Sequence, residues 1–282
     1  MSAQVHVVTD STAGLSADEQ DRYGITVVPL QVVIGGISYD EGAATSETVA
    51  EALKTYTPVS TSRPAPQAFV DAYEACAAAG AEEIVSIHLS ADMSGTFESA
   101  MIGAKESAVP VRHVDARSLG MGLGFPVITA ASVAQTGADG AAVEAAARDR
   151  IAAVSSFFYV DTLEHLRRGG RIGAAHALLG AALSVKPLLT ITDGRIVPLE
   201  KVRTSARAIA RLADIAVERA GTGPVDLAVH HLDNLAKAEA LANGLAERLP
   251  AAGDVLVRDV GAVIGAHVGP GMLAVVVAPR RS

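Results

Sequence analysis

The sequence predicts an α/β protein of two domains, with a mainly parallel, doubly wound sheet in residues 1–155 and an α+β domain with a mixed sheet in residues 156–282. In the first half, short apolar runs alternate with helical patterns, which is typical of βαβ units around a parallel sheet. The second half is less regular and contains a hairpin signal. The length of 282 residues also exceeds one average domain of about 150 residues.

The elements of the first half follow from the spacing of its apolar residues. Runs rich in Val and Ile predict strands at Val5–Thr9, Val27–Ile34, Ile84–Leu89 and Val111–Val114. Helical periodicity predicts helices at Ser16–Tyr23, Ser46–Thr55, Pro66–Ala79 and Gly95–Ser107. Ser16 and Glu19 form a capping box, so the first helix begins at a defined residue.

A change of pattern near residue 155 predicts the domain boundary. Helix patterns at Pro126–Gln135 and Ala141–Ala153 are separated by the turn-like segment 136–140, and the aromatic run 157–160 then begins a strand. Asp193-Gly194 marks a hairpin between two of the later strands. The strands predicted after this boundary are Leu188–Thr192, Arg195–Leu199, Leu227–His231 and Ala274–Ala278.

Composition excludes several classes of function. Half of the residues are hydrophobic and Trp is absent, so the core consists mainly of Ala, Val, Leu and Ile. The formal charge of −8 and the absence of a Lys/Arg run argue against nucleic-acid binding. No apolar run approaches the ~18 residues of a membrane span. Because strand residues begin at Val5, we expect no signal peptide and a cytoplasmic location. Cys76 is interpreted as a small buried hydrophobe.

Three short stretches are the candidate binding site, and each lies where a strand-like run gives way to a loop: 61–64, 94–96 and 267–271. Together they offer hydroxyls, an imidazole and backbone N–H groups without an obvious nucleophile and base. Ser62 and Ser94 precede predicted helix starts, where unsatisfied N–H groups favour an anion. These hydroxyls also suit simple helix capping, but Thr61 and Thr96 provide more than capping requires. The pattern favours binding of a carboxylate that is not converted.

The glycine-flanked residues give weaker indications. His267 lies among glycines that allow close backbone approach to a ligand. The segment 167–172 resembles a phosphate cradle around Arg171 but lacks the ending of a P-loop, and Glu164 is spaced to pair with Arg168. The glycines of 119–125 do not match a dinucleotide fingerprint and predict a loop before a helix.

Two further motifs are interpreted as structural. His230 and His231 are adjacent in a strand and therefore point to opposite faces, which argues against a shared metal ion. Asp10-Ser11-Thr12 ends the first strand and is interpreted as a turn, since no Gly-x-Ser-x-Gly elbow accompanies it.

Taken together, these motifs resemble the DegV family of bacterial fatty-acid-binding proteins over essentially the whole chain. No single motif is specific, but the ordered set is. It comprises Thr9-Asp10-Ser11-Thr12, Thr61-Ser62-x-Pro64, Leu89-Ser90-x-x-Met93-Ser94-Gly95-Thr96, Gly169-Gly170-Arg171-Ile172, Lys186-Pro187 with Asp193-Gly194, Lys201-Val202-Arg203-Thr204 and His267-Val268-Gly269-Pro270-Gly271.

The resemblance implies a non-catalytic carrier in phospholipid metabolism, with a long-chain, palmitate-like fatty acid in a tunnel between the domains. It implies that Thr61 and Ser94 hold the carboxylate, and the ligand-binding residues expected around them are Ser62, Gly95, Thr96, His267 and Arg203. Some family members present the acid to a separate fatty acid kinase, which makes Arg171 and Arg203 candidates for a partner surface. No cofactor, metal or catalytic residue is expected.

Three residues depart from the family pattern: Arg63 replaces a common glutamine, Ala65 a serine and Phe97 a tyrosine. The tail would still provide most of the affinity, since about fourteen methylenes at ~0.8 kcal/mol give on the order of 11 kcal/mol before association costs. Two or three hydrogen bonds roughly offset the desolvation of the carboxylate, so the head group sets orientation.

The alternative is a small-molecule enzyme. A hydrolase would use Ser11 or Ser94 with His267, and a phosphotransferase would use the Arg171 loop. Either would show turnover without an added kinase.

Overall fold

The computed structural model describes residues 4–178 and 186–280, and the chain divides into two compact units. The first unit comprises Met1–Gln31 and Ser62–Ala152, and the second comprises Val32–Thr61 and Ala153–Ser282. The chain passes from the first unit to the second for the last time between Ala152 and Ala153. Residues 32–61 differ from the prediction, because they belong to the second unit rather than to the N-terminal one.

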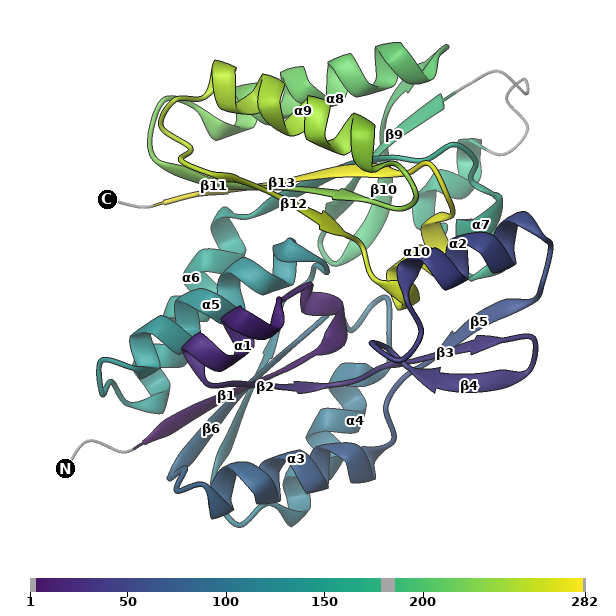
Figure 1. The fold of residues 1–282 in the computed structure, drawn as a ribbon. Helices are drawn as coiled ribbons and strands as arrows, with labels where there is room; N and C mark the ends of the chain where they lie inside the picture. Colours follow the sequence, from purple (N-terminus) through teal and green to yellow (C-terminus); the bar gives the residue numbers. More distant parts are fainter. Residues whose placement is uncertain (1–3, 179–185, 281–282) are drawn as a thin grey trace. The chain divides into compact units, whose positions relative to one another are not determined.

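The first unit contains a four-stranded sheet in which every neighbouring pair is parallel. Its helices cover both faces, with α1, α5 and α6 on one side and α3 and α4 on the other (Figure 1). The doubly wound prediction is therefore confirmed. In sheet order the strands are β2 (Ile25–Val28), β1 (Val5–Asp10), β6 (Glu83–His88) and β7 (Val111–Asp115), and the helices are α1 (Ala17–Tyr23), α3 (Pro66–Ala78), α4 (Thr96–Gly103), α5 (Met121–Ala134) and α6 (Gly140–Ala153).

The strand predicted at Val27–Ile34 is wrong, because it forms two strands in different sheets. Pro29 has no N–H to donate to a ladder, so β2 ends at Val28. The chain resumes as β3 (Gln31–Ile34), which lies between β4 (Ile37–Asp40) and β5 (Val59–Ser62) in a three-stranded sheet.

The loop predicted over residues 119–125 is also wrong, since α5 begins at Met121 and includes Gly122 and Gly124. A Cβ on Gly124 would lie 2.5 Å from the carbonyl oxygen of Ala13. The glycines therefore allow the buried first turns of α5 to pack directly on the backbone that follows β1. They serve packing in this unit.

A buried hydrogen-bond network joins the carboxyl ends of β1 and β6. The Asp10 carboxylate accepts hydrogen bonds from the Thr12 N–H at 3.1 Å and the Leu89 N–H at 2.9 Å, and it contacts His88 Nδ1 at 3.0 Å. His88 Nε2 lies 2.6 Å from Ser86 Oγ. Asp10, Ser86 and His88 have no exposed surface. The Asp10-Ser11-Thr12 segment is thus a structural turn, as the sequence indicated.

We predict that Asp10→Ala lowers the free energy of unfolding by about 3 kcal/mol or more, because buried N–H donors lose their acceptor. Urea unfolding followed by circular dichroism measures the change. Glu74→Gln, on the exposed face of α3, is the control and should stay within about 0.5 kcal/mol of wild type. An Asp10→Ala protein as stable as the control would contradict the role given to this network.

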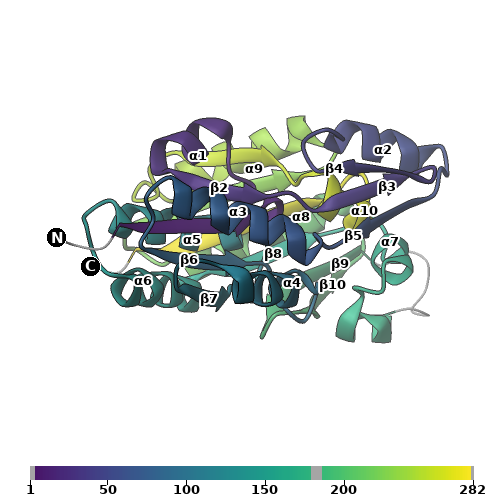
Figure 2. The same ribbon diagram turned by 90° about the horizontal axis from the view of Figure 1, so that it is seen from below.

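The second unit contains a six-stranded mixed sheet in which only β11 and β12 are parallel among the pairs described. Helices α8 and α9 pack on one face (Figures 1 and 2). The mixed-sheet prediction is confirmed. In sheet order the strands are β10 (Arg195–Val202), β9 (Lys186–Thr192), β8 (Ser155–Tyr159), β13 (Leu273–Pro279), β11 (Val225–His231) and β12 (Val255–Asp259), and the helices are α8 (Ser205–Ala220) and α9 (Leu235–Arg248).

The hairpin between β9 and β10 forms where Asp193-Gly194 predicted it, with Thr192 opposite Arg195. Asp193 and Gly194 have φ of 50° and 77°, as a two-residue turn with both central residues left-handed requires. Leucine, valine and alanine side chains of α8 and α9 fill the space above the sheet, including Leu212, Leu241 and Leu245. In the described residues, no helix is both long and apolar enough to cross a membrane.

Residues 32–61 contact the rest of the second unit through α2 (Ser46–Lys54), which packs on α10 (Ala262–Val268). A Cβ on Gly265 of α10 would lie 3.3 Å from Leu232 and 3.8 Å from Val49 of α2. Glu41 accepts a hydrogen bond from the Val263 N–H at 2.8 Å and so occupies the N-terminus of α10, where Gly261 provides no side chain. These contacts explain why segment 32–61 belongs to the second unit.

Candidate ligand-binding site

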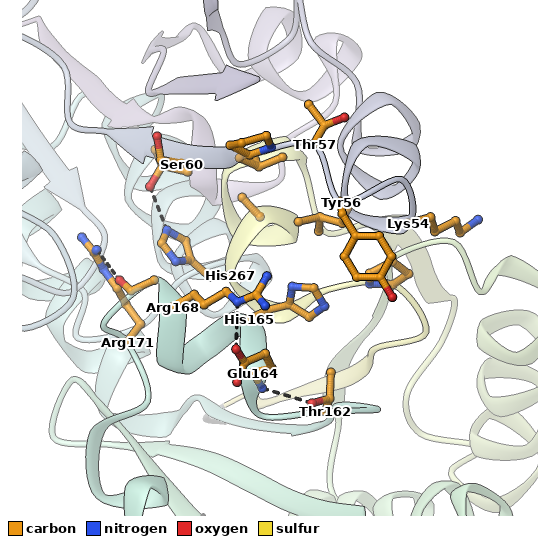
Figure 3. Close-up of a pocket in the computed structure, with 17 residues that line it drawn as sticks. Lys54, Tyr56, Thr57, Ser60, Thr162, Glu164, His165, Arg168, Arg171 and His267 are labelled. Carbon is orange, nitrogen blue, oxygen red and sulfur yellow. Dashed lines mark hydrogen bonds and ion pairs between the residues drawn. The ribbon is translucent and has the colours of Figure 1, made fainter. Parts of the chain in front are cut away.

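The second unit contains a pocket of about 790 Å³ in which α2, β5, α7 (Glu164–Arg168) and the end of α10 meet (Figure 3). Its wall combines apolar groups such as Leu53, Val59 and Pro270 with hydroxyls and cationic side chains. The polar residues are Lys54, Tyr56, Thr57, Ser60, Thr61, Thr162, Glu164, His165, Arg168, Arg171 and His267. An amphiphilic ligand with an anionic group fits this chemistry.

Thr61 and His267 meet at the pocket wall. Thr61 Oγ1 lies 2.7 Å from His267 Nε2. Alternation along β5 leaves Ser60 and Ser62 exposed and Thr61 partly buried, so the Thr61 side chain points inward. His267 reaches the site from the last turn of α10. Two residues selected from separate motifs are therefore direct partners.

The protonation of His267 determines which way this hydrogen bond runs. Burial, reinforced by the positive charge of Arg171, lowers the pKa of His267 to about 4, so the ring is neutral at pH 7. Nδ1 is buried without a hydrogen-bond partner among the described residues. We assign the proton to Nε2, because an unpaired buried N–H is rarer than an unpaired acceptor. Thr61 then accepts from His267 and keeps its own hydrogen for a ligand.

Two glycines allow the histidines of the pocket to pack where they do. A Cβ on Gly169 would overlap His267 Nδ1, and a Cβ on Gly269 would overlap the ring of His165. Gly269 also has a φ of 76°, which favours glycine. The glycine density around His267 therefore gives the imidazoles room.

The basic residues of the pocket are already engaged in contacts. Glu164 accepts hydrogen bonds from Arg168 Nε at 2.8 Å and from Arg167 Nη2 at 2.7 Å, as the spacing of Glu164 and Arg168 indicated. These bonds lower the pKa of Glu164 to about 2. Arg171 Nη1 donates to the carbonyl oxygen of Gly169 at 2.7 Å (Figure 3). The segment 167–172 thus places Arg171 in the pocket wall, and Gly169 of this segment packs against His267.

The first unit presents the second group of predicted residues. Ser94 Oγ lies 2.9 Å from Thr96 Oγ1 and accepts a hydrogen bond from the Thr96 N–H at 3.3 Å. Gly95 is the N-cap of α4 and has no capping side chain. Ser94 is partly buried, whereas Thr96 is fully buried. The Ser94 hydroxyl therefore lies at a helix N-terminus, as predicted.

Arg63 lies across the start of α4. Its Nη1 donates to the carbonyl oxygen of Gly95 at 3.2 Å and forms an ion pair with Glu98 at 2.7 Å. A Cβ on Gly95 would overlap this guanidinium. The departure from the family pattern at residue 63 thus produces an exposed ion pair that covers the glycine.

Ser62 does not lie at a helix start, and that part of the prediction is wrong. Helix α3 begins at Pro66 with Ala65 as its N-cap, and no side chain caps it. The Ser62 hydroxyl is exposed and lies 3.4 Å from the Gln31 side chain. The helix itself begins at Pro66, as the sequence predicted, so Ser62 lies before both its N-cap and its first turn.

Arg203 is exposed, directly before the N-cap Thr204 of α8, and is not among the residues that line the pocket. His230 and His231 are buried in β11, where His231 lies 3.5 Å from Asp259. The sequence pattern gave no indication of Tyr56 or His165, both of which line the pocket. His165 follows Glu164 in the arginine-rich motif, but nothing in its spacing distinguishes it.

We predict that the free energy of unfolding decreases as the pH is lowered from 6.5 towards 4, in part because of His267. In this range the unfolded chain binds a proton at His267 that the folded protein does not, which favours unfolding by up to about 3 kcal/mol at the acid end. His267→Gln should show a shallower pH dependence in urea unfolding. His176→Gln, which removes an exposed histidine of the same unit, is the control for the loss of a histidine side chain. Equal slopes for all three proteins would refute this prediction.

The similarity of this chain to known proteins extends over nearly its whole length. The chain matches the sequence model of the DegV family over residues 4–280. It is 53% identical over 281 residues to a DegV domain-containing protein of Streptomyces coelicolor, covering 99% of this chain and 100% of that one. A DegV domain-containing protein of Mycobacterium tuberculosis is 37% identical over 274 residues, covering 97% and 96%. These matches confirm the resemblance found in the motifs.

Solved structures show the same fold. A DegV family protein of Thermus thermophilus, described by its fatty acid binding, superimposes with a TM-score of 0.92 at 32% identity, covering 98% of this chain and all of that one. DegV of Bacillus subtilis, described as a fatty acid binding protein, gives a TM-score of 0.91 at 31% identity, covering 99% and 100%.

Proposed function

The chain belongs to the DegV family, and from that premise we propose that it binds a long-chain fatty acid and does not convert it. The observation that carries the proposal is the contact of 2.7 Å between Thr61 Oγ1 and His267 Nε2 in the pocket wall. With the His267 proton assigned to Nε2, the Thr61 hydroxyl has its own hydrogen available for a ligand. Solved relatives described as fatty acid binding proteins support the choice of ligand. A palmitate-like acid supplies both the anionic head and the apolar length that this chemistry favours.

In the proposed complex, the carboxylate accepts hydrogen bonds from Thr61 and Ser94. Thr61 belongs to the second unit and Ser94 to the first, so the head group would draw on both. Hydrogen bonds to a charged group contribute about 1.5–3 kcal/mol each, which is comparable to the cost of desolvating the carboxylate. The head group therefore sets the orientation of the acid, and the proposed burial of the tail between the domains supplies the affinity. Gly95, Thr96 and Ser62 remain candidate neighbours of the head group.

The same proposal includes presentation of the bound acid to a fatty acid kinase, by resemblance to members of the family. Arg171 and Arg203 remain the candidates for the surface that such a partner would contact. Arg203 is exposed, and Arg171 lines the pocket that contains Thr61. The two arginines therefore have different environments, and only Arg203 lies outside the pocket wall.

No specific observation favours the alternative function, a small-molecule enzyme. Ser11 Oγ accepts a hydrogen bond from the Leu30 N–H at 2.9 Å, which ties two loops of the first unit together. Ser94 Oγ contacts Thr96, and His267 Nε2 contacts Thr61. These hydroxyls and this imidazole have partners suited to structure or to binding.

We expect Thr61→Val and Ser94→Ala each to weaken palmitate binding by about 1.5–3 kcal/mol, because each loses one hydrogen bond to a charged group. Isothermal titration of delipidated protein measures the dissociation constants. Thr192→Val removes an exposed hydroxyl at the end of β9 and is the matched control. Mass spectrometry of the organic extract of freshly purified protein should identify a bound long-chain acid. Wild-type protein that is empty and takes up no added acid would overturn the proposal.

A further inference from the structure

Tyr56 occupies a backbone position that normally belongs to glycine. It follows α2 directly after the C-cap Thr55, with a φ of 58°. The Thr57 N–H donates to the Ala52 carbonyl at 2.8 Å, and the Tyr56 N–H donates to the Leu53 carbonyl at 3.3 Å. This pair of bonds defines a Schellman motif, whose left-handed residue is usually glycine because a Cβ is unfavourable there.

Contacts of the Tyr56 side chain within the fold do little to offset the free-energy cost of its left-handed backbone conformation. It is 87% exposed, the highest exposure among the large hydrophobic side chains of the described residues. No hydrogen bond or ring contact of its side chain is found within those residues. Packing within the protein therefore does not explain an aromatic residue at this position.

The location of the ring suggests a reason for an aromatic residue at this position. Tyr56 lines the pocket that contains Thr61 and His267, and Figure 3 draws its ring together with Lys54 and His165, which line the same pocket. Thr57, Val59 and Thr61 continue from it along the same wall. An exposed ring at this point has free surface that a bound molecule can cover.

We infer that Tyr56 is a ligand-contacting residue of this pocket, whose ring packs on the bound acid and slows its release. The inference rests on the proposed function, since it takes a fatty acid anchored at Thr61 as the occupant. Contact made by the ring in the complex mainly affects the dissociation rate, because association is governed by diffusion and orientation. The left-handed backbone of Tyr56 ends the helix and keeps the ring at the pocket.

The test separates the contribution of residue 56 to folding from its contribution to binding. Delipidated protein is loaded with the fluorescent fatty acid cis-parinaric acid, and its dissociation is followed by stopped flow after addition of excess oleate. The variants are Tyr56→Gly, Tyr56→Asn and Tyr56→Phe, and the control is Tyr39→Ala, an exposed tyrosine of β4 outside the pocket wall. Thermal unfolding of each protein without ligand is measured in parallel.

We expect Tyr56→Gly to unfold at the same or a higher temperature than wild type, and to release the probe about tenfold faster, which corresponds to about 1.4 kcal/mol. Tyr56→Asn tolerates the left-handed conformation but lacks the ring, so it should also release faster. Tyr56→Phe and Tyr39→Ala should match the wild-type rate.

Release from Tyr56→Gly within a factor of two of wild type overturns the inference, and so does a clearly lowered unfolding temperature, which would show that the ring supports the fold. Faster release in Tyr39→Ala would equally contradict it. Wild-type protein that takes up no probe overturns the proposed function as well. Normal uptake with unchanged release in the variants rejects the role of Tyr56 alone.

Discussion

The hydrogen bond between Thr61 and His267 joins residues 206 positions apart in the chain. It requires β5 and α10 to meet, and that meeting depends on the return of residues 32–61 to the second unit. Glu41 at the N-terminus of α10 and Val49 of α2 beside Gly265 hold this segment in place. The site therefore rests on an insertion from the N-terminal half into the C-terminal unit.

The same bond combines packing with chemistry. The His267 ring is buried against the backbone of Gly169, and burial keeps it neutral. A neutral ring with its proton on Nε2 leaves the Thr61 hydrogen available to a carboxylate. A charged imidazole would attract an anion more strongly, but at this depth its desolvation is unfavourable. The fold thus provides neutral hydrogen-bond donors at a helix end and in the pocket wall.

Glycine serves several different purposes in this chain. Gly169 and Gly269 give two imidazoles room, and Gly124 lets α5 approach the backbone after β1. In the Gly120–Gly124 region this packing role replaces the loop suggested by the glycine pattern. At residue 56 the reverse holds, because tyrosine stands where glycine would be favourable. Such departures from local preference direct attention to function.

The sequence by itself determined the parallel sheet of the first unit, the hairpin at Asp193-Gly194, the family and the motifs that contain Thr61, Ser94 and His267. These depend on local periodicity, turn chemistry and motif order, which a linear chain displays. Tertiary structure decided the assignment of residues 32–61 to the second unit, the partnership of Thr61 with His267, and the presence of Tyr56 and His165 in the pocket. Contacts between distant residues depend on packing of side chains in three dimensions, and no spacing along the chain encodes them.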